Sequence, residues 1–436
     1  MRITLFAHGS RGDVWPIVAL GWRLAARDHD VTVAVPGEFQ AFTERAGLRT
    51  VALPFDLMTW LSKREGQELL RSGGLAVTRG LGREYSRHAD AFDAAYETAA
   101  HGAEALVATL MTLERTMALA DLQRLPLAMV YQQPVAPSRQ YSSLPLTRGK
   151  LRSPAMRQLS GKLAYSLWWR SNASATRAFR RKLGVSARAR PAFHRLQDHR
   201  ALGLHTVSPS LFPRPTDWPD NLKVTGAWEM PSALRENLGE GLPADFQAWL
   251  DAGDPPIFLG FGSMPVLDPQ PLFDDIVSVT GALGRRAIVS RNCVPRAVEA
   301  LPEHLWAVDA LDHDRLFPQC AAVVHHGGIG STTASLRAGR PTMVCSVFAD
   351  QPWWGERIRR LGVGTHLSFR KLDRDNLESG LRKLLDPAVA ARAEQLGAAI
   401  RAEGDGLPEA TQLLEDWLVV AEPMPSRRRA SRMGVT

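Results

Sequence analysis

The sequence predicts an α/β protein of two domains, each built on a doubly wound parallel sheet. Short apolar runs alternate with helical periodicity in both halves of the chain, which is the pattern of strand–helix–strand units. Proline density rises sharply between Pro209 and Pro231, as expected of a stiff linker. A length of 436 residues is enough for two or three domains.

The first half of the chain, residues 1–210, is the expected first domain. Residues 55–101 lack strand character and are predicted to be helices and loops beside the sheet, and a proline- and serine-rich loop at 133–145 precedes a long basic helical region. The expected strands are 3–8, 31–35, 48–53, 105–109, 127–132 and 204–207, with helices at 14–26 and 39–46.

The second half repeats this alternation after a linker at 211–235, in which only the short run LKVTG has strand character. We assign residues 236–420 to a second domain and 421–436 to a disordered basic tail. The expected strands are 257–260, 286–290, 306–308, 321–324, 342–347 and 364–367, and the expected closing helices are 374–385, 389–402 and 408–420.

Composition is typical of a soluble globular protein, with 45% hydrophobic and 22% charged residues. No apolar run approaches the length that crosses a bilayer. The three cysteines, Cys293, Cys320 and Cys345, have neither a metal-binding spacing nor the pattern of a disulfide framework. A reducing, cytoplasmic location is therefore expected.

The net charge of +8 has two concentrated sources, the basic tail and ten basic residues between Arg148 and Lys182. A basic helix containing Trp168 and Trp169 is compatible with a membrane-surface or nucleic-acid face. We favour a solvated helical face whose two tryptophans cover a pocket or pack inward, since no zinc, RNA-binding or helix-turn-helix signature accompanies it. The sequence predicts no nucleic-acid partner and at most peripheral contact with a membrane.

The stretch 325–356, HHGGIGSTTASLRAGRPTMVCSVFADQPWWGE, predicts an anion site. It begins where a buried strand ends, and its glycine-rich turn runs into a helix with hydroxyls in the first turn. Such a helix start has unpaired N–H groups and a positive dipole end, and glycine allows a phosphate to approach the backbone. A tight turn with glycines for steric reasons alone is the alternative. The paired histidines and the later Asp350–Gln351 favour phosphate binding.

The turn after the first strand, His8 to Pro16, should face a binding crevice, because ligands of open parallel sheets bind beyond the carboxyl ends of the strands. It lacks the G-x-G-x-x-G dinucleotide fingerprint. Asp13 is placed to act as a helix N-cap. A carboxylate at this place is also suited to act as a general base, and the two roles are compatible.

Both stretches closely resemble those of the two-domain GT-B nucleotide-sugar glycosyltransferases. The resemblance is to the family-1 branch, which holds sterol glucosyltransferases and enzymes that glycosylate antibiotic aglycones. It covers nearly the whole chain and is strongest at 1–55, 131–145 and 305–365. It implies two Rossmann-like parallel-sheet domains that face each other across a cleft, with the last helix returning to the first domain.

The resemblance also implies roles for individual residues. Asp13 would be the general base, a role that we favour over that of a cap alone, and Asp350 and Gln351 would contact the donor sugar. Plant relatives commonly carry a ribose-binding glutamate near position 334, where this chain has Ala334, so UDP and dTDP both remain open. The expected donor-binding residues are Ser10, Arg11, Gly262, Ser263, His313, His326, Gly328, Gly330, Ser331, Thr332, Asp350 and Gln351. The expected acceptor-binding residues are His8, Trp60, Tyr141 and Trp168.

Asp-x-Asp occurs at Asp28–Asp30 and at Asp312–Asp314, and such a pair holds a divalent metal in the other large glycosyltransferase fold. Here turn and cap positions explain both pairs better, so we predict that no metal and no other cofactor is required.

The predicted reaction is an inverting, metal-independent transfer of a sugar from a UDP- or dTDP-sugar to a hydroxyl of a lipophilic small molecule. The alternatives are a GT-B-fold sugar-nucleotide epimerase and an inactive nucleotide-sugar-binding partner protein. The sequence leaves the oligomeric state open.

Overall fold

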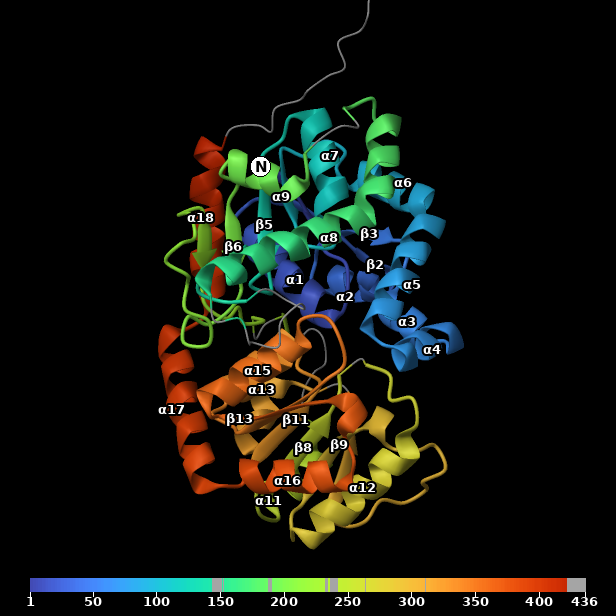
Figure 1. Ribbon diagram of the computed structural model, residues 1–436, viewed down its shortest axis with the longest axis vertical. Coiled ribbons are helices and arrows are strands. Elements are labelled where there is room, and N and C mark those ends of the chain that lie inside the picture. Colours follow the sequence, from blue (N-terminus) through green and yellow to red (C-terminus); the bar gives the residue numbers. More distant parts are fainter. Residues whose placement is uncertain are drawn as a thin grey trace, which may run out of the picture.

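The structure is a computed structural model that describes residues 1–142, 151, 153–186, 190–231, 234–235, 242–262, 264–309 and 311–421. It consists of two α/β domains stacked along the long axis of the molecule, with helices packed around each sheet (Figure 1). Every strand pairing in both sheets is parallel. The fold class expected from the sequence is confirmed.

The first sheet has seven strands within the described residues, in the order β3-β2-β1-β4-β5-β6-β7. Its strands are β1 (Arg2–Phe6), β2 (Asp30–Pro36), β3 (Arg49–Leu53), β4 (Ala105–Ala108), β5 (Leu127–Tyr131), β6 (Gly203–His205) and β7 (Leu222–Val224). The strand order reverses between β1 and β4, and a crevice opens at such a switch point beyond the carboxyl ends of the strands. The turn that carries Asp13 follows β1 and therefore borders this crevice.

Strand β7 lies inside the range 211–235 that was expected to be linker. It pairs in parallel with β6, with Leu222 opposite Gly203 and Val224 opposite His205. The first sheet therefore continues past residue 210, and the boundary expected there is too early. The strand falls on the run LKVTG, which has strand character in the sequence, but its place in the first sheet depends on pairing with β6 and leaves no local signal.

The helices of the first domain include the four that fill residues 55–101, as expected. They are α1 (Arg11–Ala25), α2 (Gln40–Arg45), α3 (Leu57–Ser62), α4 (Arg64–Ser72), α5 (Gly74–Arg87), α6 (Ala89–Ala99), α7 (Leu113–Gln123), α8 (Pro154–Lys182) and α9 (Ala192–Asp198). Helix α1 begins three residues before the expected start at Val14, because Ser10 rather than Asp13 is its N-cap.

The second sheet has six strands within the described residues, in the order β10-β9-β8-β11-β12-β13. Its strands are β8 (Ile257–Gly260), β9 (Ala287–Ser290), β10 (Leu305–Val308), β11 (Ala322–His325), β12 (Thr342–Ser346) and β13 (Gly364–Ser368). Its helices are α11 (Ala244–Asp251), α12 (Pro269–Ala282), α13 (His313–Leu316), α14 (Ile329–Arg337), α15 (Gln351–Leu361), α16 (Arg374–Leu384) and α17 (Pro387–Glu403). All of the strands expected here are confirmed to within two residues.

The last helix, α18 (Gly406–Val420), crosses back to the first domain, where it packs against α1, at the opposite end of the molecule from α16 (Figure 1). Leu407, Leu414 and Leu418 join the buried cluster formed by α1 and the first sheet. On the surface, Glu415 accepts hydrogen bonds from Arg27 and pairs with His29. This crossing matches the implication of the family resemblance and ties the two domains together.

Replacing Gly406 by alanine should loosen this crossing. A Cβ at Gly406 would lie 1.9 Å from the carbonyl oxygen of Thr225, which is main chain and has little room to move. Overpacking of this kind typically costs about 1–3 kcal/mol. We expect chemical denaturation to show that loss for Gly406→Ala. Gly82→Ala, on α5 with open space around it, should be neutral or slightly stabilising. Equal free energies of unfolding for the two variants would contradict the packing.

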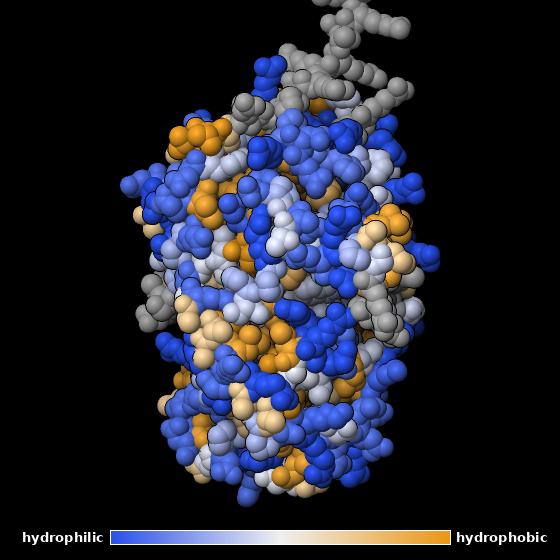
Figure 2. All heavy atoms as spheres, turned by 60° about the vertical axis from the view of Figure 1, so that its left-hand side comes forward, coloured by the Kyte–Doolittle hydropathy of each residue, from blue (hydrophilic) through white to orange (hydrophobic). Residues whose placement is uncertain are grey.

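The surface seen in Figure 2 is mostly hydrophilic, with hydrophobic side chains in small separate groups. Within the described part of the chain, no helix is both long and apolar enough to cross a bilayer. The three cysteines are buried and unpaired. The basic tail expected at 421–436 lies outside the described residues, except for Ala421.

Candidate active site

A cavity of about 1860 Å³ lies between the two domains. The first domain contributes the turn after β1 together with parts of α3, α5, α6, α7 and α8. The second domain contributes the loops after β8, β9, β10, β11 and β12. Most of these segments follow the carboxyl ends of strands in the two sheets, so the cavity lies where ligands of parallel α/β sheets bind.

Asp13 reaches the cavity from the first turn of α1. The N–H and hydroxyl groups of Ser10 both donate hydrogen bonds to Oδ2 of Asp13, at 2.8 and 3.0 Å. Gly9 has a φ of +134°, and a Cβ there would lie 2.4 Å from the same oxygen. Burial raises the pKa of Asp13, while the bonds from Ser10 lower it. The carboxyl group is thus held in one orientation and made more basic by its surroundings.

His8 does not line the cavity, contrary to its expected role in acceptor binding. It is buried at the end of β1, where Nε2 lies 2.9 Å from the carbonyl oxygen of Phe55 and therefore carries the proton. Its Nδ1 then accepts the hydroxyl proton of Tyr85, at 2.7 Å. Burial lowers the pKa of His8 to about 4. His8 thus lies behind the cavity wall and holds the hydroxyl of Tyr85, a residue that does line the cavity.

Two of the expected acceptor-binding aromatics belong to the core instead. Trp60 is buried and packs against Phe55. Tyr141 donates a hydrogen bond to the carbonyl oxygen of Ala136, and its ring meets Trp353 edge-on. Neither residue lines the cavity. Large aromatic side chains beside a cleft often pack into the core behind its walls instead of contacting the ligand, because burying them removes much apolar area from water.

Trp168 lines the cavity as expected, together with side chains that the sequence analysis did not select. Away from the Asp13 turn, this half of the cavity is mainly apolar and aromatic; its charged side chains are Glu114 and Arg115, and its hydroxyl-bearing ones include Thr78, Ser86 and Thr176. Its unselected lining side chains include Leu57, Met58, Leu81, Phe92, Tyr96, Leu110 and Met111. These residues lie on three different helices and one loop, and no local pattern distinguishes them from core residues.

The glycine-rich turn after β11 has the geometry expected of an anion site. Gly327 has a φ of +93°, and α14 begins directly after Gly328. The ring of His326 fills the space between two glycines: a Cβ at Gly328 would lie 2.6 Å from its Nε2, and one at Gly262 would lie 2.9 Å from its Cε1. Gly330 faces open space. The backbone of the first turn of α14 is therefore accessible from the cavity.

His326 is half-buried, and its Nδ1, which is shielded from solvent, has no hydrogen-bond partner among the described residues. Burial lowers the pKa of His326 to about 4, so the imidazole is neutral near pH 7. A neutral ring presents one N–H donor and one acceptor. His326 can therefore offer a hydrogen bond to an oxyanion without itself carrying charge.

Thr332 does not line the cavity, contrary to expectation. Its side chain is fully buried, whereas Ser331 and Thr333 both line the cavity. Consecutive residues on a helix point about 100° apart, so a cluster of three hydroxyls cannot share one face. Ser263, which was expected to bind the donor from the glycine turn after β8, lies outside the described residues.

In the turn after β8, the side-chain amide of Asn292 donates to the carbonyl oxygens of Gly262 and Met264, at 3.1 and 3.0 Å.

Asp350 and Gln351 both line the cavity at the start of α15. The indole N–H of Trp354 donates to Oδ2 of Asp350 at 2.8 Å. The side-chain oxygen of Gln351 accepts the backbone N–H of Val347 at 2.8 Å, which leaves its amide nitrogen to donate. Burial and the nearby charge of Asp13 raise the pKa of Asp350 to about 7. Two carboxyl groups from opposite domains thus influence each other across one cavity.

Because the pKa of Asp350 is raised, the pH dependence of the free energy of unfolding tests the position of this side chain. A buried carboxyl group with a raised pKa stabilises the folded protein fully at low pH, and that contribution is lost as the pH rises from about 4 through about 7. Relative to Asp350→Asn, the free energy of unfolding of the wild type should therefore fall by a few kcal/mol across that range. Denaturant titrations at pH 5 and pH 8 measure this difference. The exposed Asp90→Asn is the control, and a wild-type profile parallel to that of Asp350→Asn would be inconsistent with burial.

Arg11 and His313 meet the cavity from opposite domains. The Arg11 guanidinium lies 4.1 Å from the ring centroid of Trp15. His313 stacks on Phe317 with ring centroids 4.4 Å apart. Burial, followed by the charge of Arg11, lowers the pKa of His313 to about 4. A cation and a neutral imidazole are therefore available beside the glycine turns.

Both Asp-x-Asp pairs occupy the turn and cap positions that the sequence predicted. Asp28 has a φ of +63° in the turn before β2. Asp312 caps α13 by accepting the N–H of Asp314 at 2.9 Å. Asp312 and Asp314 both form ion pairs with Arg235, and Asp314 forms a second with Arg337.

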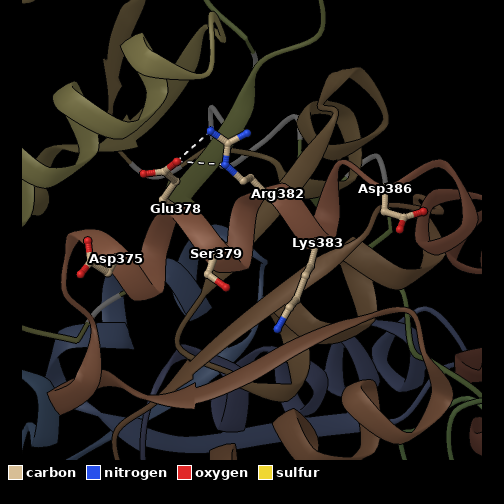
Figure 3. A pocket seen from close by; sticks show the side chains of 6 residues that line it. All are labelled: Asp375, Glu378, Ser379, Arg382, Lys383 and Asp386. Atoms are coloured by element: carbon tan, nitrogen blue, oxygen red, sulfur yellow. Dashed lines mark hydrogen bonds and ion pairs between the residues drawn. The ribbon is translucent and has the colours of Figure 1, made fainter.

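A second, smaller hollow of about 450 Å³ lies along the outer face of α16 and is separate from the interdomain cavity (Figure 3). It is lined by Asp375, Glu378, Ser379, Arg382, Lys383 and Asp386. Glu378 and Arg382 form an exposed ion pair one helical turn apart, which is the ordinary chemistry of a solvated helix face. We assign no ligand to it.

Two family models match the chain. One is described as the N-terminal domain of glycosyltransferase family 28 and matches residues 3–108. The other is described as the C-terminal domain of erythromycin biosynthesis protein CIII-like proteins and matches residues 279–415. The two matches fall on the two halves of the cavity.

Individual proteins match over nearly the whole chain. O-mycaminosyltylonolide 6-deoxyallosyltransferase of Streptomyces fradiae is 32% identical over 434 residues, which cover 96% of this chain and 97% of that protein. Sterol 3-beta-glucosyltransferase of Arabidopsis thaliana is 29% identical over 440 residues, which cover 98% of this chain and 69% of that protein.

Among solved structures, the calicheamicin glycosyltransferase CalG4 superposes with a TM-score of 0.68 at 18% identity, covering 97% of this chain and 100% of CalG4. Glycosyltransferase VinC in complex with dTDP superposes with a TM-score of 0.62 at 19% identity, covering 95% and 99% of the two chains. These likenesses show the shared fold. Together with the full-length relative at 32% identity, they show that this chain is a GT-B glycosyltransferase of the family-1 type, in the branch that contains the antibiotic-aglycone and sterol glycosyltransferases.

Proposed function

We propose that this glycosyltransferase transfers a sugar from a nucleoside diphosphate sugar to a hydroxyl group of a lipophilic small molecule, with inversion at the anomeric carbon and without a metal ion. One observation carries the proposal. Asp13 of the first domain and the start of α14 in the second domain face the same cavity. A base and an anion site are thereby brought together, although more than 300 residues separate them in the sequence.

Asp13 is the base in this proposal. The acceptor oxygen attacks the anomeric carbon and loses its proton to the carboxylate, which Ser10 and Gly9 hold in place. The bond from the anomeric carbon to the nucleotide oxygen breaks on the opposite face, and the electron pair leaves with the diphosphate. Displacement from the opposite face inverts the anomeric centre.

The leaving diphosphate gains negative charge as the bond breaks, and the start of α14 is built to receive it. The N–H groups of the first helical turn and the positive end of the helix dipole act where Gly330, which faces open space, leaves room for phosphate oxygens. The neutral ring of His326 adds one N–H donor. Preorganised donors of this kind are commonly a large part of enzymatic rate enhancement.

The substrate classes are supported by both halves of the cavity. Asp350 and the free amide of Gln351 match the hydroxyl groups of a sugar. The apolar half matches a lipophilic acceptor, and the relatives named above act by name on O-mycaminosyltylonolide and on sterols. Two structural neighbours were solved with thymidine diphosphate, and Ala334 leaves both dTDP and UDP as candidates.

The test is a titration with dTDP- and UDP-sugars, followed by mass-spectrometric screening of hydrophobic hydroxylated acceptors in the presence of the preferred donor. We expect one nucleotide to bind, a product heavier by one sugar residue, an inverted anomeric configuration by NMR, and full activity in EDTA. Activity lost in EDTA and restored by Mg²⁺ or Mn²⁺ would refute metal independence. Retention of the anomeric configuration would refute displacement from the opposite face. A new sugar epimer formed from the donor alone would show that the protein is an epimerase.

A further inference from the structure

Helix α8 carries an exposed apolar stripe that the interdomain reaction does not use. Met156, Leu159, Leu163 and Leu167 are 54%, 63%, 49% and 47% exposed, and they account for half of the large exposed hydrophobics among the described residues. Their spacing of three and four residues places them on one face of the helix. Leaving four large aliphatic side chains in water along one helix indicates a surface that is covered in use. We call these four residues the α8 stripe.

The opposite face of α8 is firmly held by the first domain. The ring of Tyr165 stacks on Phe193 with centroids 3.8 Å apart, Phe179 is fully buried, and a Cβ at Gly161 would lie 2.8 Å from the Cα of Pro137. The exposure of the α8 stripe is therefore a property of a docked helix and does not reflect a helix that has come away from the protein.

The exposed charges of α8 and of α5 beside it have a single sign. The 29 residues of α8 include no aspartate or glutamate, and the exposed Lys162 and Arg170 lie within one turn of stripe residues. Helix α5 contacts α8 and adds the exposed Arg79 and Arg83, while its one acidic residue, Glu84, is buried and paired with Arg87. An apolar stripe flanked by cations fits a surface that is apolar inside and negative outside.

The α8 stripe also borders the cavity. Leu167 belongs to the stripe and lines the cavity, as do its neighbours Ala164 and Trp168. Helix α5 lines the same half of the cavity through Leu81 and Tyr85. The outer face of α8 is thus continuous with the apolar half of the cavity, which the proposed function assigns to the acceptor.

We propose that the outer face of α8, flanked by α5, docks on an anionic lipid bilayer. Met and Leu side chains of the α8 stripe enter the boundary between headgroups and acyl chains, and the basic residues contact anionic headgroups. A lipophilic acceptor dissolved in the bilayer then has a short apolar route to the cavity. This last consequence rests on the proposed function, whereas the docking itself does not.

Other occupants fit the observations less well. A second copy of the chain paired through the same face would set cations against cations, because a twofold interface brings a patch onto itself. The centres of protein interfaces are enriched in aromatic residues, and the α8 stripe has none. Aliphatic side chains flanked by lysine and arginine are the chemistry of helices that lie on membranes.

The experiment is co-sedimentation of the full chain with vesicles of phosphatidylcholine alone or mixed with phosphatidylglycerol, without donor or acceptor. Because no sugar is transferred, the result is independent of whether the proposed reaction is correct. We expect binding to the mixed vesicles that weakens as salt is raised, and little binding to the neutral ones. Equal binding to both vesicle types, or binding to neither, would overturn the proposal.

Variants locate the surface. Leu159→Glu with Leu163→Glu should weaken binding at least about tenfold, since burying one leucine is worth about 1.5–3 kcal/mol. Lys162→Gln with Arg170→Gln should weaken it about fivefold for each basic side chain removed. Val419→Glu, at a still more exposed apolar position on α18, is the control and should bind as the wild type does.

Two readouts separate docking from its competitors. Unchanged thermal unfolding of the leucine variant shows that the loss is not a loss of folding. Light scattering of the wild type should show no dimer that the leucine variant lacks. A dimer abolished by Leu159→Glu with Leu163→Glu would assign the α8 stripe to self-association and overturn the bilayer as its partner.

Discussion

Asp13→Asn should lower kcat by about 10²–10⁴, the usual contribution of a positioned general base. Asparagine has nearly the same shape and can still accept the Ser10 N–H through its side-chain oxygen, so the start of α1 is preserved. It cannot take a proton from the acceptor. Steady-state kinetics with a saturating donor measure the loss. The affinity for the nucleoside diphosphate should stay within about twofold of the wild type, because the phosphate-binding turn belongs to the other domain.

The design of this experiment separates chemistry from folding. Asp13→Ala removes the hydrogen-bond acceptor of Ser10 as well as the base, so it should lose activity and also lower the thermal unfolding temperature. The exposed Asp90→Asn removes a surface carboxylate from α6 and should change neither. If Asp13→Asn retained wild-type kcat, the base would have to be another group, and the proposed mechanism would fail at its first step.

His326→Ala should lower kcat by about 10²–10³, the usual effect of removing one preorganised donor to a developing anion. The imidazole fills the gap between Gly262 and Gly328, so the variant also leaves a hole beside the glycine turn. Nucleoside diphosphate affinity should fall as well, because the diphosphate is the group contacted. Single-turnover kinetics and calorimetric titration with dTDP and UDP measure the two effects separately.

The matched variants for this prediction are His326→Gln and His101→Ala. Glutamine supplies an N–H donor without the ring and should recover part of the rate, whereas a purely structural role would give no recovery. His101 is exposed at the end of α6, far from the turn in sequence, and its loss should have no effect. Because His326 is neutral near pH 7, its contribution should not change between pH 6 and pH 8. If the rate of the wild type changed between pH 6 and pH 8 and the rate of His326→Ala did not, His326 would not be a neutral donor.

Local signals in the sequence were sufficient for most of the fold. Runs such as 257–260 are bounded by prolines and glycines and have no alternative to a buried strand, so their positions were predicted closely. The boundary after residue 210 is the exception, because β7 lies beyond it. The run LKVTG has strand character of its own, but only its pairing with β6 assigns it to the first sheet.

The site divides in the same way. Gly9, Asp13, His326, Gly328 and their neighbours were found because a strand, a tight turn and a helix start fix both the geometry and the chemistry within a few residues. The wrong assignments were side chains whose direction depends on distant packing. Thr332 faces the interior of its own domain, and Trp60 packs beneath α5.

What the sequence by itself determined is the chemistry at each strand end, namely a carboxylate after β1 and a glycine-rich turn with a helix start after β11, because local backbone geometry encodes both. The tertiary structure alone decided which side chains form the acceptor half of the cavity and which apolar residues of α8 are left outside. Those choices depend on which faces of α3, α5, α6, α7 and α8 pack against each other, and the hydrophobic effect that drives this packing is non-directional. A sequence therefore specifies that an aromatic side chain is apolar, and only its neighbours in space decide whether it contacts the core, the ligand or the solvent.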